Sequence, residues 1–151
     1  MTGFRKGTLV LICSIILASS WAFSQSEEAN SILGRAGGGV LTIIGYGADK
    51  AEIIKGSALA LAEDVIVTAY HVIAQAFDVE AVNFKGKKVK IEGVLGVDKA
   101  RDIALLKLKG KVQALPIGTI DNLAEGARIF ALGSNESGQI VISEGTLRRA
   151  V

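Results

Sequence analysis

The sequence contains a single histidine, His71, whose setting suits a residue that transfers protons. The apolar run VIV at residues 65–67 precedes it, and the segment HVIAQA that begins with it has the composition of a short helical turn. A side chain at such a junction is held rigidly by the strand and remains accessible to solvent. General base catalysis needs both properties, and imidazole, with a reference pKa of about 6.5, exchanges protons near neutral pH. A lone histidine is more often structural, but this context makes His71 the first candidate catalytic residue.

Asp102 is the second candidate, because it directly precedes the apolar segment IALLKLK. Burying a carboxylate without a partner costs about several kcal/mol, so an acid at this position requires a hydrogen-bond donor. One interpretation is that Asp102 merely ends a surface loop beside Lys99 and Arg101. The other is that Asp102 accepts the Nδ1 hydrogen of His71. That contact would fix the imidazole tautomer and leave Nε2 free to take a proton from a nucleophile.

Composition excludes several other functions for this chain of 151 residues, about one domain in length. One histidine and one cysteine are too few for a zinc site of thiolates and imidazoles within a monomer, and no glycine-rich segment ends in Gly-Lys-Ser/Thr. We therefore expect no metal and no cofactor. The formal net charge of +2 comes from Arg5 and Lys6 in the acid-free first 24 residues. The rest of the chain is neutral, so we expect no binding to nucleic acid.

Residues 1–24 have the organisation of an export signal. Arg5 and Lys6 precede an apolar run at 8–16, and Ala22-Phe23-Ser24 then places small residues at alternate positions, as signal peptidases require. We expect cleavage after Ser24 and export of a mature protein without cysteine to the periplasm or the extracellular space. The alternative is a membrane anchor through residues 8–23, which is short for a span of about 20 apolar residues. We expect contact with a membrane only if this segment is retained.

The pattern beyond the signal predicts an all-β fold. Residues 25–39 are polar and then glycine-rich, which indicates a flexible arm. From Val40 onward, short β-branched runs alternate with turn residues, as in sandwiches and barrels. We expect helical turns at 71–76 and near 122–125, and strands at 40–46, 52–61, 64–69, 79–84, 89–96, 103–109, 128–132 and 139–147.

The segment Lys85-Gly86-Lys87-Lys88 separates two of these expected strands and predicts a hairpin turn, in which the glycine supplies unusual backbone angles. Its lysines form no convincing basic patch, because lysines at a sheet edge commonly prevent aggregation between sheets.

Five motifs in order make the chain resemble the trypsin-like serine peptidases of the Deg/HtrA type. They lie in the segments GSALALAEDVIVTAYHVI, GVDKARDIALLKLKG, ALPIG and ARIFALGSNESGQIVISEGTLRR, from about Gly56 to Arg149. The resemblance implies a chymotrypsin-like architecture, with a first β-barrel over 40–115 and, over 116–151, a link and the first strands of a second barrel. It also implies polypeptide substrates, with His71 as the general base and Asp102 as its orienting acid.

The family's nucleophile is a serine in a Gly-Asn/Asp-Ser-Gly-Gly segment, and the sequence contains no such segment. Ser57 stands where the family has a serine without catalytic duty. Ser134, Ser137 and Ser143 lie in GSNESGQIVIS, which the family places at a loop and strand leading into the second barrel. Ser137 is followed by one glycine and then glutamine, so it matches a displaced nucleophile poorly.

Three interpretations therefore stay open. The chain is the front part of a longer exported serine endopeptidase, which we favour; or the inert product of a disrupted gene; or an inert barrel that binds proteins or peptides, since a fold does not determine a function. The presence of both His71 and Asp102 favours the peptidase, because a pure binding module has no physical need for the pair. On that interpretation we expect these 151 residues alone to be inactive.

Overall fold

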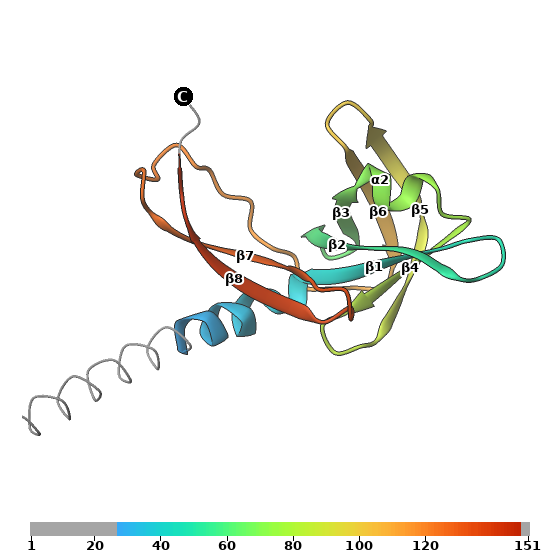
Figure 1. Ribbon diagram of the computed structural model, residues 1–151, viewed down its shortest axis with the longest axis horizontal. Helices are drawn as coiled ribbons and strands as arrows, with labels where there is room; N and C mark the ends of the chain where they lie inside the picture. Colours follow the sequence, from blue (N-terminus) through green and yellow to red (C-terminus); the bar gives the residue numbers. More distant parts are fainter. Residues whose placement is uncertain (1–26, 149–151) are drawn as a thin grey trace, which may run out of the picture.

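The computed structural model describes residues 27–148, so the export signal expected over 1–24 lies outside the described residues. Six antiparallel strands close into a barrel in the order β1-β2-β3-β6-β5-β4, and β7 and β8 form a separate two-stranded sheet (Figure 1). Their bounds are β1 (Val40–Tyr46), β2 (Glu52–Ala62), β3 (Val65–Ala69), β4 (Asp78–Asn83), β5 (Lys88–Asp98), β6 (Ile103–Lys109), β7 (Arg128–Ser134) and β8 (Ile140–Thr146). The predicted all-β barrel is confirmed.

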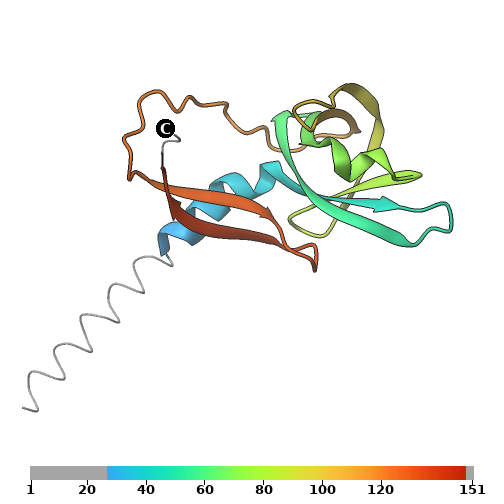
Figure 2. The same ribbon diagram turned by 45° about the horizontal axis from the view of Figure 1, so that its top comes forward.

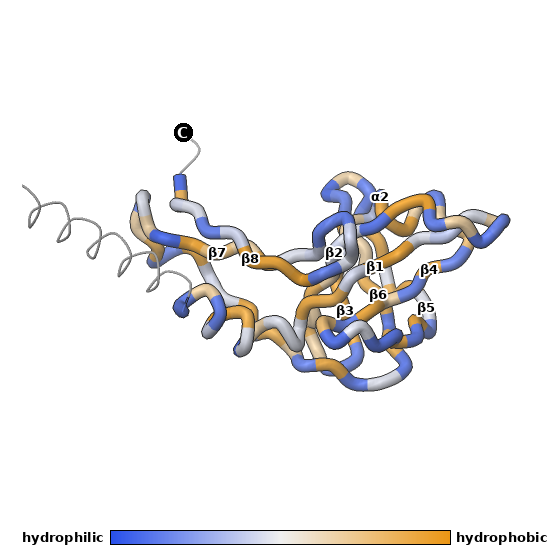
Figure 3. The backbone as a smooth tube through the Cα atoms, turned by 60° about the horizontal axis from the view of Figure 1, so that its bottom comes forward, coloured by the Kyte–Doolittle hydropathy of each residue, from blue (hydrophilic) through white to orange (hydrophobic). Residues whose placement is uncertain are grey.

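The barrel is filled by side chains from alternate positions of its strands, as in other small barrels. Along β6, the inward positions are Ala104, Leu106 and Leu108, each at most 2% exposed, and their neighbours are half-buried or exposed. Leu41 and Ile43 of β1 are completely buried in the same core. This two-residue period is also present in the sequence, where it predicts the strands. Figure 3 shows the same apolar character along the strands and hydrophilic residues in the loops.

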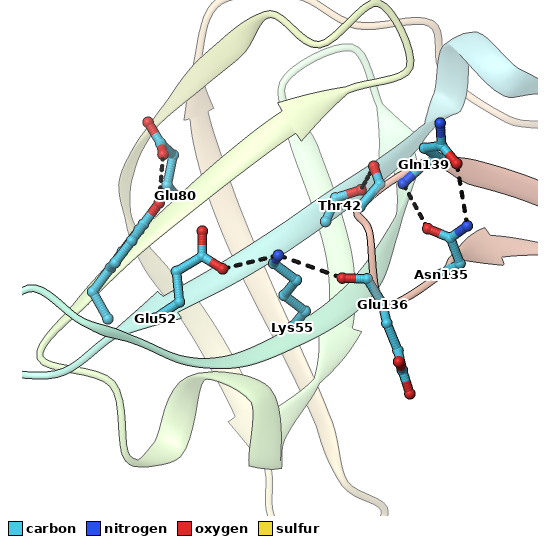
Figure 4. Close-up of polar contacts among 9 residues, drawn as sticks. Thr42, Glu52, Lys55, Glu80, Asn135, Glu136 and Gln139 are labelled. Carbon is cyan, nitrogen blue, oxygen red and sulfur yellow. Dashed lines mark hydrogen bonds and ion pairs between the residues drawn. The ribbon is translucent and has the colours of Figure 1, made fainter.

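The β7-β8 sheet is attached to the barrel through the end of β7 and the turn that follows it. Ser134 donates its backbone N–H to Oγ of Ser57 at 2.8 Å and its hydroxyl to the Gly56 carbonyl at 3.0 Å. The buried Thr42 hydroxyl donates to the carbonyl of Gly138 at 3.0 Å. Figure 4 shows Lys55 of β2 reaching between the Glu52 carboxylate, at 2.8 Å, and the backbone carbonyl of Glu136, at 3.4 Å. Polar contacts thus join the two sheets.

The expectation of a flexible arm over 25–39 is wrong where the structure describes it: residues 27–36 are helical and η1 (Gly37–Gly39) follows as a 3-10 turn. The half-buried residues of the helix are Ala29, Ile32, Leu33 and Ala36, which share one helical face. The period is present in the sequence, but the adjacent glycines and polar residues obscured it. None of the helices within residues 27–148 has the length and apolar character needed to cross a bilayer.

One ion pair links the helix over residues 27–36 to the β7-β8 sheet. Arg128 on β7 donates to Glu28 of the helix at 2.6 Å and to Glu144 on β8 at 2.5 Å. Figure 2 shows the helix beside the two strands of this sheet. At the other end of the helix, the Gln113 side chain donates to the backbone carbonyl of Arg35. These contacts join segments distant in the sequence, so their stabilising effect on the helix could not be predicted from local composition.

The two expected helical turns have different outcomes. The first is confirmed as α2 (Tyr70–Ala74). The second, near 122–125, is wrong, because that segment contains only turns and irregular backbone. Thr119 and Asp121 hydrogen-bond locally there, and Gly126 has a φ of 82°, both of which oppose a helix. The predicted hairpin turn after β4 is present, with Gly86 at a φ of 75°.

Candidate active site

The pairing register of β3 and β6 brings the two predicted residues together. Ala69, the last residue of β3, pairs with Ile103, the first residue of β6. The residues just beyond this pair, Tyr70 and Asp102, must therefore be neighbours, and the Tyr70 N–H donates to the Asp102 carbonyl at 3.1 Å. His71 follows in the first turn of α2, so its side chain lies beside the Asp102 carboxylate.

The Asp102 carboxylate contacts His71 with both of its oxygens. Oδ1 accepts the backbone N–H of His71 at 2.8 Å, and Oδ2 lies 2.6 Å from Nδ1 of the ring. An ionised carboxylate only accepts hydrogen bonds, so the ring nitrogen that faces it must carry the proton. This geometry holds His71 in the Nδ1–H tautomer. It leaves Nε2 as the proton acceptor, which is the arrangement that a general base needs.

The hydrogen bonds from His71 also hold the Asp102 carboxyl group ionised. They lower its pKa below the ordinary value, first through the backbone N–H of His71 and then through its ring. A group with a depressed pKa stabilises the fold above its unfolded pKa, about 3.9 for aspartate, and loses that contribution as the pH falls through the depressed value. The Asp102 carboxyl group therefore stays ionised through neutral and mildly acid pH. The His71 side chain is 64% exposed, so it is accessible from solvent.

Asp102 adopts a left-handed backbone conformation, with a φ of 56°. Few residues other than glycine do so, although aspartate and asparagine tolerate it better than most. In this conformation the carbonyl of Asp102 faces Tyr70 while its carboxylate faces His71. Sequence reasoning missed this feature, because no local signal distinguishes an aspartate that must turn left-handed.

The helix α2 is anchored by Val72, which is 3% exposed and lies over β2 at Gly56. A Cβ atom at Gly56 would lie 2.6 Å from Cγ2 of Val72, so only glycine permits this close approach. Gly56 belongs to one of the motifs in the sequence, but its packing role cannot be predicted from that motif. The glycine lets α2 lie close to the barrel, and this places His71.

Replacing Gly56 with alanine is therefore expected to destabilise the protein by about 1–3 kcal/mol, because the stiff Val72 side chain has to move. Urea unfolding of the two proteins measures the difference. Gly93→Ala on β5 is the matched control, since nothing lies within 4 Å of a Cβ built there. Equal stability of the two variants would contradict this account of α2.

In the part of the chain that the structure describes, no serine is hydrogen-bonded to the His71 side chain. Ser57 and Ser134 have their hydroxyl oxygens 3.2 Å apart and join the barrel to β7. Ser137 is exposed in the turn between β7 and β8, and Ser143 lies on β8 opposite Ala131. Within residues 27–148, the hydrogen bonds of the His71 side chain include none to a hydroxyl group.

Two hollows in the surface lie away from the pair. One, of about 400 Å³, lies between β2 and the turn after β7 and is lined by Glu52, Ile54, Lys55, Ser134, Asn135 and Glu136. A wider one, of about 840 Å³, lies where β4 and β5 diverge, beside Tyr46 and Phe77. Neither His71 nor Asp102 lines them. Across residues 27–148, no group of three or more His, Cys, Asp or Glu side chains is placed to hold a metal ion.

Comparison with known proteins yields one family and two relatives. The family model described as trypsin-like peptidase domain matches residues 56–151. Anti-sigma-I factor RsgI9 of Acetivibrio thermocellus is 29% identical over 132 residues, which are 83% of this chain and 19% of that protein. Protease Do-like 1, chloroplastic, of Arabidopsis thaliana is 33% identical over 92 residues, which are 57% of this chain and 21% of that protein. The chain thus spans about a fifth of the length of these relatives.

Proposed function

The chain belongs to the trypsin-like peptidase domain family, and from this premise we propose that it is part of an exported serine endopeptidase of the Deg/HtrA type. In this proposal His71 is the general base and Asp102 orients it. The observation that carries the proposal is the double contact of the Asp102 carboxylate with the backbone and the ring of His71. Similarity to the Do-like protease supports the Deg/HtrA assignment.

The chemistry follows from the tautomer. Nε2 of His71 takes the proton of a serine hydroxyl as the oxygen attacks a peptide carbonyl, and it later returns the proton to the leaving amine. Asp102 stabilises the imidazolium formed between these two steps. The nucleophile and the oxyanion hole come, in this proposal, from a segment beyond Val151. If the reading frame is extended or corrected, we expect a Gly-Asn/Asp-Ser-Gly-Gly segment within a few tens of residues after Arg149. A longer frame without it would refute the peptidase.

A second candidate function is a barrel that binds proteins or peptides without hydrolysing them. The similarity to an anti-sigma factor, which extends over 83% of the chain, favours it. So does the absence, within residues 27–148, of a hydroxyl group bonded to the His71 side chain. The two functions differ in what they require of the His71–Asp102 pair, because only the peptidase depends on it.

A polypeptide of residues 25–151 is expected not to hydrolyse peptides. Within residues 27–148 no serine is hydrogen-bonded to the His71 side chain, and the sequence contains no Gly-Asn/Asp-Ser-Gly-Gly segment to supply an oxyanion hole. We therefore expect no acyl-enzyme to form. Incubation with a denatured protein substrate, followed by mass spectrometry of released peptides, measures this. Turnover that Ser137→Ala abolishes and Ser143→Ala preserves would contradict the expectation and identify Ser137 as the nucleophile.

Export is expected to remove residues 1–24. The motivation is the order of basic, apolar and small residues around Arg5, Lys6 and Ser24. The mass of the intact exported protein decides between cleavage and anchoring. A mature species that begins at Gln25 supports export by cleavage, whereas retention of the apolar segment at 8–23 favours the membrane anchor.

A further inference from the structure

The hairpin that presents Asp102 is closed by a second aspartate, Asp98, which the proposed mechanism does not use. We propose that Asp98 is a positioning residue for the His71–Asp102 pair. Its carboxylate binds the backbone N–H of Arg101 and thereby holds the loop over residues 99–102 in the conformation that directs Asp102 at His71. The role of Asp98 in catalysis rests on the proposed function. Its effect on the loop and on the tautomer of His71 does not.

The loop between β5 and β6 has little backbone hydrogen bonding of its own. Asp98 and Ile103 pair across the hairpin, so residues 99–102 must reverse the chain between them (Figure 1). The backbone hydrogen bond that closes the loop, from the Asp102 N–H to the Lys99 carbonyl, is long at 3.4 Å. The bond from the Arg101 N–H to Oδ1 of Asp98 is shorter, at 3.0 Å. A side chain therefore supplies the stronger of these two constraints on the loop.

The hydrogen bond from the Arg101 N–H to Asp98 acts next to Asp102, whose backbone conformation needs support. The left-handed conformation of Asp102 is unfavourable for a residue with a Cβ atom, and such conformations persist only where the surroundings enforce them. The contact of Asp102 with His71 gives limited enforcement, because both side chains are about half exposed or more, at 48% and 64%. By fixing Arg101, Asp98 restrains the residue immediately before Asp102.

Asp98 makes two contacts with Arg101, and only one of them shapes the loop. Oδ2 of Asp98 lies 2.6 Å from Nη1 of the guanidinium, whose side chain is 77% exposed. Ion pairs this exposed contribute little, because water replaces either partner readily. The hydrogen bond to the backbone N–H restrains the chain itself. Both contacts lower the pKa of Asp98, the guanidinium more than the N–H, so the carboxylate stays ionised at neutral pH.

Nuclear magnetic resonance of the full chain tests the inference, because its one histidine makes the ring nitrogen signals unambiguous. In the wild type at a pH where the ring is neutral, we expect the Nδ1–H tautomer to dominate. In Asp98→Ala the ratio of Nδ1–H to Nε2–H should fall roughly three- to tenfold, the effect of losing one orienting hydrogen bond. Asp98→Asn retains an acceptor for the Arg101 N–H and should keep the wild-type ratio.

Two controls separate the backbone contact from the ion pair. Arg101→Ala removes the guanidinium but keeps the backbone N–H, so it should leave the ratio near that of the wild type. Glu52→Ala removes an ion pair of the same three-residue spacing, to Lys55 on β2, and should also leave it unchanged. An unchanged ratio in Asp98→Ala would overturn the inference. So would a change in Arg101→Ala as large as that in Asp98→Ala.

Hydrogen exchange of the wild type provides a measurement that does not depend on the folding of any variant. The Arg101 amide should exchange at least about tenfold more slowly than an unbonded loop amide, because Asp98 accepts its hydrogen. Exchange at the unbonded rate would overturn the inference even if Asp98→Ala did not fold. If the proposed hydrolytic function is wrong, a longer protein that contains this chain will lose no turnover in His71→Ala, yet the tautomer ratio of the chain will still respond to Asp98. The two failures are therefore distinguishable.

Discussion

Replacing His71 with alanine is expected to lower kcat by about 10⁴- to 10⁶-fold in the proposed longer peptidase that contains this chain and a nucleophilic serine. The magnitude is that of Ser–His–Asp triads in general, in which the members act as a unit. The physical reason here is that His71 is the one histidine of the chain and that Asp102 holds its Nε2 free to accept a proton. Hydrolysis of an unfolded protein at saturating concentration measures the effect.

The loss should come from chemistry and not from unfolding. The His71 side chain is 64% exposed, and α2 is anchored by Val72 instead, so the variant should keep the circular dichroism spectrum of the wild type. Gln75→Ala, at the exposed end of the same helix, is the matched control and should retain activity. Wild-type proteolysis by His71→Ala would remove the catalytic role from His71 and contradict the proposed function.

Asp102→Asn is expected to lower kcat by about 10⁴-fold, again by comparison with triads in general. The structure supplies a specific reason. Oδ1 of Asp102 accepts the backbone N–H of His71, so the asparagine must place its amide oxygen there and its NH₂ group opposite Nδ1. Two donors cannot face each other. Nδ1 must then become the acceptor, and the proton moves to Nε2, where it blocks the general base.

The tautomer is measurable without turnover. Ring nitrogen shifts of the single histidine should show Nδ1–H in the wild type and Nε2–H in Asp102→Asn. Asp102→Ala serves as the control, since it removes the acceptor without adding a donor and should give a mixture of tautomers. Nδ1–H in Asp102→Asn together with a large loss of activity would mean that Asp102 acts by some other route than the tautomer.

The strands of the barrel could be predicted from the sequence because their signal is local. In β6, alternate side chains enter the core, and the order of apolar and polar residues in the sequence shows this alternation directly. The helix over residues 27–36 was missed because its stability depends on distant partners, among them Arg128 on β7. The helical turn expected near 122–125 failed for a local reason, because the hydrogen bonds between Thr119 and Asp121 compete with a helix.

The same distinction between local signals and distant contacts applies to the candidate site. The sequence alone identified the two candidate residues, because His71 and Asp102 are recognisable by residue type and by motif. Only the tertiary structure decided that they meet, because their approach depends on the register of β3 against β6. It also decided how they meet. The left-handed turn at Asp102 and the close packing of Val72 on Gly56 depend on contacts between segments that no local pattern encodes.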